Sequence, residues 1–129
     1  MKKTALFCLL LLAFSGYSQN CAKYREGKFK VTDPKSKKVC IITREGETQT
    51  EKMEEAEEVY TFDIKWLDDC TYTLTPTAST LARNKDVKDI GTMTVKIIQV
   101  RDSSYTHRIT VANNPKFRRV DEVFAVKED

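Results

Sequence analysis

The chain has 129 residues, and 22 lysine and arginine side chains stand against 19 aspartate and glutamate side chains, for a formal net charge of +3. This length is normal for one domain with one hydrophobic core. Removal of an N-terminal segment that contains Lys2 and Lys3 leaves 20 basic against 19 acidic residues. Such a balance gives no global case for nucleic-acid binding, so we expect no nucleic-acid partner.

The first residues have the layout of a secretory signal peptide. Two lysines precede an almost unbroken apolar run from Ala5 to Phe14, and Gly16 and Ser18 occupy the minus-three and minus-one positions of a cleavage site. The run is too short to span a bilayer as a permanent helix, and a buried N-terminal helix is the alternative. We expect residues 1–18 to be removed and residues 19–129 to form a single β domain.

Lipid anchoring and a permanent membrane span are not expected. A lipid anchor needs a small residue directly before the modified cysteine, whereas Phe7 precedes Cys8 and Asn20 precedes Cys21. No second apolar run approaches the length of a membrane span. We therefore expect a periplasmic or secreted protein.

Three cysteines remain after cleavage, and an exported protein meets an oxidising environment. We expect a disulfide between Cys21 and Cys70, because both lie at the edges of strand-like regions. Cys40 lies inside an apolar strand, where a free thiol behaves as a small hydrophobe. A metal site is not expected, because the chain has no CxxC motif and His107 is the only histidine.

The stretch from Val59 to Leu74 has the clearest strand pattern in the chain. Large apolar side chains alternate with polar ones on either side of the corner at Asp68 and Asp69, which predicts a β-hairpin with one wet face and one aromatic face. The residues of the aromatic face are Tyr60, Phe62, Ile64, Trp66, Tyr72 and Leu74.

Similar alternation recurs along the rest of the chain at intervals of roughly ten residues. The further strands that we expect are Gly27–Thr32, Lys38–Arg44, Thr48–Met53, Thr92–Arg101, Tyr105–Ala112 and Arg118–Val126. Turn signals separate them, among them Asp33-Pro34, Gly46 and Asn113-Asn114-Pro115. We expect an all-β antiparallel meander of about eight strands, in a small lipocalin-like closed or half-closed barrel.

Two segments are less regular. Thr48–Glu58 is rich in glutamate and therefore in helix formers; we read its first half as a strand and Glu54–Glu57 as a hairpin tip, with a short helix as the alternative. Ser79–Arg83 is expected to form one helical turn, and Asn84–Asp89 an exposed loop.

No catalytic signature is present. His107 is the only imidazole that could act as a base, and no G-x-S-x-G elbow or glycine-rich phosphate loop occurs. Asp68 and Asp69 have the chemistry of a Ca²⁺ site or an acid pair, but a turn whose carboxylates accept local backbone N–H groups explains them better. We expect no enzyme activity and no cofactor.

Charge is segregated along the chain. Seven basic residues lie between Lys23 and Lys38, and seven acidic residues lie between Glu45 and Glu58. The structural interpretation is pairing between adjacent strands of opposite charge. The functional interpretation is a bipolar surface that steers a charged partner.

The aromatic face of the central hairpin also has two interpretations. Its six residues, Tyr60, Phe62, Ile64, Trp66, Tyr72 and Leu74, are suited to packing in the core and equally to lining a cavity for a small apolar ligand. A measured cavity is needed to distinguish them.

Two stretches resemble a group of short exported bacterial proteins. In residues 21–29, Cys21 precedes a Gly-x-Phe strand, and in residues 65–74, Trp66 and Cys70 form a Trp-x-x-x-Cys corner. The resemblance implies a small β-rich fold, supports the Cys21–Cys70 pairing and implies no catalytic residues. Some proteins of this group carry a DNA topoisomerase IV name, an activity for which this chain is too short and shows no nucleotide site.

Three functions agree with these expectations. The first is a monomeric, non-enzymatic binding or interaction module of the cell envelope, with an unknown protein as its partner. The alternatives are a carrier of a small apolar ligand in a barrel cavity and an inhibitor of an envelope-directed hydrolase. A cavity of several hundred Å³ favours the carrier, whereas a packed interior with a flat charged patch favours the interaction module.

Overall fold

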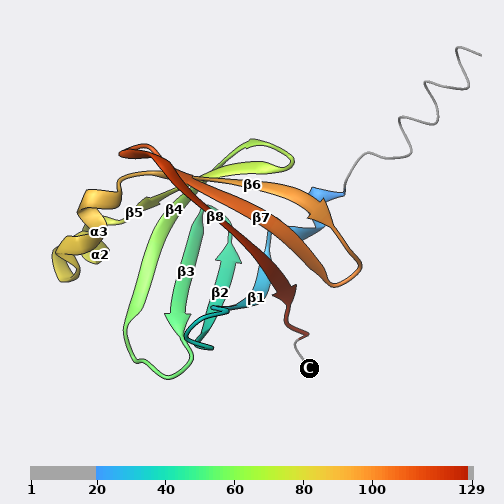
Figure 1. Ribbon diagram of the computed structural model, residues 1–129, viewed down its shortest axis with the longest axis horizontal. Helices are drawn as coiled ribbons and strands as arrows, with labels where there is room; N and C mark the ends of the chain where they lie inside the picture. The colour runs from blue at the N-terminus through green and yellow to red at the C-terminus, as the bar shows by residue number, and fades with distance from the viewer. Residues whose placement is uncertain (1–19, 128–129) are drawn as a thin grey trace, which may run out of the picture.

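The computed structural model describes residues 20–127, and the predicted signal peptide, residues 1–18, lies outside the described residues. These residues form a closed antiparallel barrel in which eight strands follow one another in sequence order (Figure 1). The strands are β1 (Gly27–Thr32), β2 (Val39–Glu45), β3 (Thr48–Met53), β4 (Val59–Asp68), β5 (Thr71–Pro76), β6 (Met93–Val100), β7 (Ser104–Val111) and β8 (Asn114–Ala125). The predicted all-β meander barrel is confirmed.

The barrel closes where β8 pairs with β1. Phe29 lies opposite Ala125 and Lys30 lies opposite Phe124, so the first and last strands both lose their free edge. Every other pair joins consecutive strands in antiparallel register. Inward and outward side chains alternate along the strands except at the register shifts in the β4–β5, β6–β7 and β7–β8 pairs, which is why the period of two in the sequence predicted the elements well.

The glutamate-rich segment follows the strand interpretation. Thr48–Met53 is β3, as predicted, and the chain then turns before β4. The expectation that basic and acidic strands lie side by side is wrong. The basic strand β1 and the acidic strand β3 each pair with β2, which lies between them.

Two short helices follow β5. The predicted helical turn is confirmed as α2 (Ala78–Arg83), and the side chain of its N-cap Thr77 accepts a hydrogen bond from the backbone N–H of Thr80. The predicted loop over Asn84–Asp89 is wrong, because this segment forms most of α3 (Lys85–Ile90). Aspartate in the first turn and lysine in the last complement the helix dipole, and no residue of α3 is buried.

The last strand is longer than predicted. β8 begins at Asn114 instead of Arg118. Of the turn predicted over Asn113-Asn114-Pro115, only Asn113 lies in the turn, and the other two residues belong to the strand. A register shift between Thr110 and Val111 accompanies this start. Such a bulge accommodates a proline, which has no N–H for the ladder.

One end of the barrel is closed by the N-terminal segment. The 3₁₀ helix η1 (Cys21–Tyr24) is joined to the β4–β5 corner by the Cys21–Cys70 disulfide, with Cα atoms 5.2 Å apart. This disulfide confirms the predicted pairing, and Cys40 is the free cysteine of the described residues. No helix in residues 20–127 is long and apolar enough to cross a membrane.

The opposite end carries the β1–β2 and β3–β4 loops, the two α-helices and the β7–β8 turn. Figure 1 shows α2 and α3 together at this end. Asn113 in the β7–β8 turn donates a hydrogen bond from Nδ2 to the backbone oxygen of Asp89 in α3, at 3.1 Å. The helices are therefore tied to the rim of the barrel.

Candidate ligand-binding cavity

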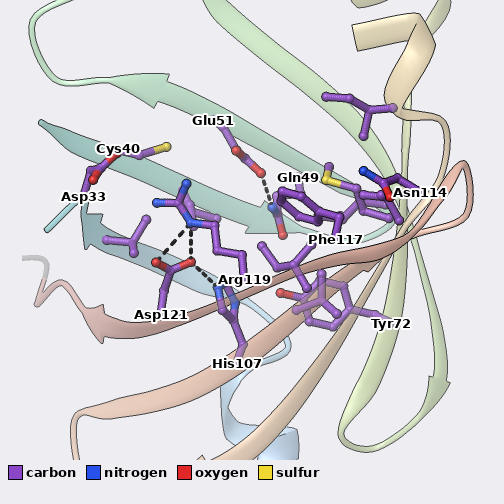
Figure 2. A pocket seen from close by; sticks show the side chains of 18 of the residues that line it. Asp33, Cys40, Gln49, Glu51, Tyr72, His107, Asn114, Phe117, Arg119 and Asp121 are labelled. Carbon is purple, nitrogen blue, oxygen red and sulfur yellow. Dashed lines mark hydrogen bonds and ion pairs between the residues drawn. The ribbon is translucent and has the colours of Figure 1, made fainter. Parts of the chain in front are cut away.

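The barrel encloses a cavity of about 510 Å³, bounded by inward side chains of seven strands and by the open rim (Figure 2). One part of its wall is apolar. Its residues come mainly from β2, β5, β6 and β7 and include Ile42, Leu74, Met93, Val95, Ile109 and Val111. A volume of this size accommodates a small organic molecule.

The other part of the wall is polar. Gln49 and Glu51 reach the cavity from β3, His107 from β7, and Arg119 and Asp121 from β8. Figure 2 shows them as two hydrogen-bonded groups, one joining the β3 residues and one joining the β7 and β8 residues. A ligand in this cavity meets hydrocarbon on one side and hydrogen-bonding groups on the other.

Arg44 lies beneath the cavity, where β2 approaches the closed end, and its side chain is almost completely buried at 2% exposure. Its Nε donates to Oε1 of Gln49 at 2.8 Å and its Nη1 to the backbone oxygen of Tyr24 at 2.8 Å. Its Nη2 donates to the Tyr72 hydroxyl at 2.7 Å and to the Tyr105 hydroxyl. All four acceptors are neutral, so no carboxylate touches this buried cation.

Aromatic rings surround the same guanidinium. Its carbon lies 4.6 Å from the ring centroid of Phe29, 4.9 Å from that of Tyr72 and 5.5 Å from that of Tyr105. The ring faces attract the cation electrostatically and partly replace its hydration. Arg44 therefore joins the floor of the cavity to the closed end of the barrel.

Glu51 is a carboxyl group of the cavity that is linked to Arg44 through the side chain of Gln49. Its Oε2 accepts a hydrogen bond from Nε2 of Gln49 at 2.7 Å. Burial raises the pKa of this carboxyl above its ordinary value, although the Gln49 hydrogen bond and the nearby Arg44 charge both act in the opposite direction. No ion pair of the described residues includes Glu51.

The second polar group is built around Asp121. Its Oδ2 lies 3.2 Å from Nε2 of His107 and 2.9 Å from Nε of Arg119, and the His107 and Asp121 side chains are 6% and 7% exposed. The hydrogen bond from His107, together with Arg119, lowers the pKa of Asp121. An ionised Asp121 accepts a hydrogen bond from Nε2–H, and Nδ1 of His107 remains buried without a hydrogen-bond partner in the described structure.

The thiol of Cys40 also lines the cavity. Burial and the neighbouring Glu51 raise its pKa to about 12. The thiol is therefore protonated at neutral pH and is a poor nucleophile. Within residues 20–127, no group of three histidine, cysteine, aspartate or glutamate residues is arranged to hold a metal ion.

The six residues predicted from the central hairpin divide between cavity and core. Tyr72 and Leu74 line the cavity. Phe62 and Ile64 belong to the buried core, and Tyr60 and Trp66 are partly buried against that core, so these four are not among the lining residues. Trp66 packs on Tyr72, with ring centroids 4.6 Å apart.

Sequence reasoning missed the polar wall. Arg44, Gln49 and Glu51 lie in predicted strands but were not recognised as inward residues. The alternation contains the signal: Arg44 has the same parity as the buried Ile42, two residues before it. A charged residue in phase with an apolar face marks a position where a buried polar network is needed.

Comparison of this chain with protein-family models, curated proteins and solved structures finds no match.

Proposed function

We propose that this protein is an exported carrier that binds a small, largely apolar ligand inside its barrel. The single observation that carries the proposal is the cavity of about 510 Å³, with the apolar side chains that line it. A barrel with a packed interior favours a module that acts through its outer surface. This volume, open at the rim, instead favours the carrier over the interaction module and the hydrolase inhibitor.

The polar groups of the cavity agree better with binding than with catalysis. His107 is hydrogen-bonded to Asp121, and no nucleophilic side chain of residues 20–127 forms a hydrogen bond with its ring. The Cys40 thiol is held protonated. Neither group provides the activated nucleophile that a hydrolytic enzyme requires.

Two features support export to the periplasm or the medium. The N-terminal residues have the pattern of a cleaved signal peptide. The Cys21–Cys70 disulfide is of a kind that persists in oxidising compartments. A carrier in such a compartment transfers an apolar molecule through an aqueous phase.

A matched pair of variants on β7 tests the proposal. Ile109→Trp places a large ring in the cavity, whereas Thr110→Trp places the same ring on the outer face, one residue away. An environment-sensitive apolar dye such as N-phenyl-1-naphthylamine is titrated into the mature protein, and its fluorescence is followed. We expect saturable binding to the wild type and to Thr110→Trp, and a loss of at least about tenfold in affinity for Ile109→Trp.

Equal dye affinity in both variants contradicts a ligand site inside the barrel. The physiological ligand is then sought by native mass spectrometry of protein purified gently from its producing cells. A bound small molecule that is absent from purified Ile109→Trp supports the carrier, and co-purification of a stoichiometric protein with an empty cavity contradicts it.

A further inference from the structure

We propose that the ligand of this cavity carries a protonated amine, with Glu51 as the residue that recognises it. This inference rests on the proposed carrier function and specifies the chemistry of the same site. The ligand class is an apolar body with one ammonium group.

The first argument is the unpaired state of Glu51. One carboxyl oxygen accepts the Gln49 amide at 2.7 Å, and no basic side chain of residues 20–127 forms an ion pair with it. Removal of a carboxylate from bulk water is costly unless a partner compensates its charge. Burial raises the pKa of Glu51 although Arg44, His107 and Arg119 all act to lower it, and an ammonium group in the cavity adds the direct partner that the carboxylate lacks.

The second argument is that Glu51 is the acceptor of the polar wall that remains open to a ligand. His107 is 4% exposed and lines the cavity, and its Nε2 is engaged by Asp121. Its Nδ1 has no hydrogen-bond partner, but this atom is covered by the surrounding side chains and is out of reach of a ligand. A ligand that donates a hydrogen bond is therefore matched by the carboxyl group of Glu51.

Two of the cations near the cavity, Arg44 and Arg119, are already matched, and Lys38 lies exposed at the rim, which argues against an acidic head group at the polar wall. Arg44 makes hydrogen bonds to four oxygens from beneath the cavity. Arg119 is paired with Asp121 through both carboxylate oxygens, at 3.2 and 2.9 Å. An anionic ligand therefore has to compete with Asp121 for Arg119 and also has to approach Glu51.

The apolar part of the ligand has a defined place. Leu74, Val95 and Ile109 form the hydrocarbon wall. An unbranched alkyl chain against this wall gains burial, while its terminal ammonium lies at the polar wall. Octylamine, 1-octanol and octanoate are therefore matched probes, with one tail and three head groups.

The experiment measures the affinity of the three probes by isothermal titration calorimetry. We expect octylamine to bind the wild type at least about tenfold more tightly than octanol, and octanoate to bind more weakly than octanol. Glu51→Gln should lower octylamine affinity by about tenfold or more and leave octanol affinity within about threefold. Glu51→Asp, which retains the charge, should recover part of the loss, and the exposed Glu47→Gln should behave as the wild type.

The outcomes separate the two proposals. If octylamine and octanol bind equally well in the wild type and in Glu51→Gln, the amine inference is overturned and the carrier function stands. Tighter binding of octanoate than of octylamine overturns the inference in favour of an acidic ligand held by Arg119. If none of the three probes binds and the apolar dye also fails, the carrier function is overturned together with the inference.

Discussion

Arg44 and Glu51 do not touch, yet one side-chain amide joins them. Gln49 accepts a hydrogen bond from Arg44 Nε at 2.8 Å through its oxygen and donates one to Glu51 Oε2 at 2.7 Å through its nitrogen. The amide orientation is therefore set by charges at both ends. A buried cation at the floor of the barrel is coupled in this way to a carboxyl group in the cavity.

The first prediction concerns Arg44. Arg44→Met keeps a long side chain but leaves the Tyr72 and Tyr105 hydroxyls, the Tyr24 carbonyl and the Gln49 oxygen without their donor. We expect a loss of about 3 kcal/mol in the free energy of unfolding, measured by urea denaturation. The exposed Arg118→Met is the control. A loss no larger than that of the control contradicts a structural role for the network.

The second prediction concerns the pH dependence that Glu51 produces. Its folded-state pKa lies above the ordinary value of 4.5, so between these two values the folded protein binds more protons than the unfolded chain. Stability therefore falls as pH rises through this window, and the penalty is complete above the folded-state pKa. Glu51→Gln removes the penalty and should stabilise the empty protein at neutral pH by on the order of 1 kcal/mol.

The measurement is the urea midpoint of wild type and Glu51→Gln at several pH values from 4 upward. The two curves should converge at the acidic end and separate as pH rises, with the variant more stable. A variant that is more stable and yet binds octylamine less well identifies Glu51 as a residue kept for binding at a cost in stability. If the variant is less stable at neutral pH, the carboxylate is instead a stabilising counter-charge for Arg44.

Most of the fold follows from side-chain alternation. Each strand of a barrel has one inner and one outer face, so residues such as Phe62 and Ile64 reveal the element by their period alone. The disulfide followed from the positions of Cys21 and Cys70 at strand edges. Helix α3 was missed because its six residues include only two apolar side chains, Val87 and Ile90, which are too few to establish a helical period.

The cavity was less predictable than the strands. Alternation along a strand identifies which residues point inward. Whether those side chains fill the barrel or leave a cavity depends on their summed volumes and on the stagger of the strands. Tyr72 and Trp66 have the same parity along the hairpin, yet only Tyr72 reaches the cavity. The polar wall is also assembled from β3 and from the β7–β8 pair, which are distant from β3 in sequence and come near it only when the barrel closes.

The third prediction concerns the Cys21–Cys70 disulfide, whose cysteines are 49 residues apart in sequence. We expect the double variant Cys21→Ser, Cys70→Ser to lose about 4 kcal/mol in the free energy of unfolding. Without the disulfide the unfolded chain is no longer constrained by a closed loop and therefore has more conformational entropy. Cys40→Ser, which leaves the disulfide intact, is the control. Identical urea midpoints for the double variant and the wild type contradict the prediction.

The fourth prediction tests the attachment of α3 to the rim. Gly91 has φ +73°, and a Cβ added there lies 2.8 Å from Nδ2 of Asn113, the group that bonds Asp89. Gly91→Ala should therefore cost about 1–2 kcal/mol and increase hydrogen exchange in α3.

Gly46→Ala is a control for a positive φ without a steric contact, because Gly46 has φ +61° and no atom within 4 Å of an added Cβ. Gly91→Ala should cost more, because Gly91 combines φ +73° with ψ −148° and an added Cβ also displaces Asn113. In an Asn113→Ala background the steric part disappears, so Gly91→Ala should then cost less than it does in the wild type. If the cost of Gly91→Ala is the same with and without Asn113, the strain lies in the backbone and α3 is not held to the rim by this contact.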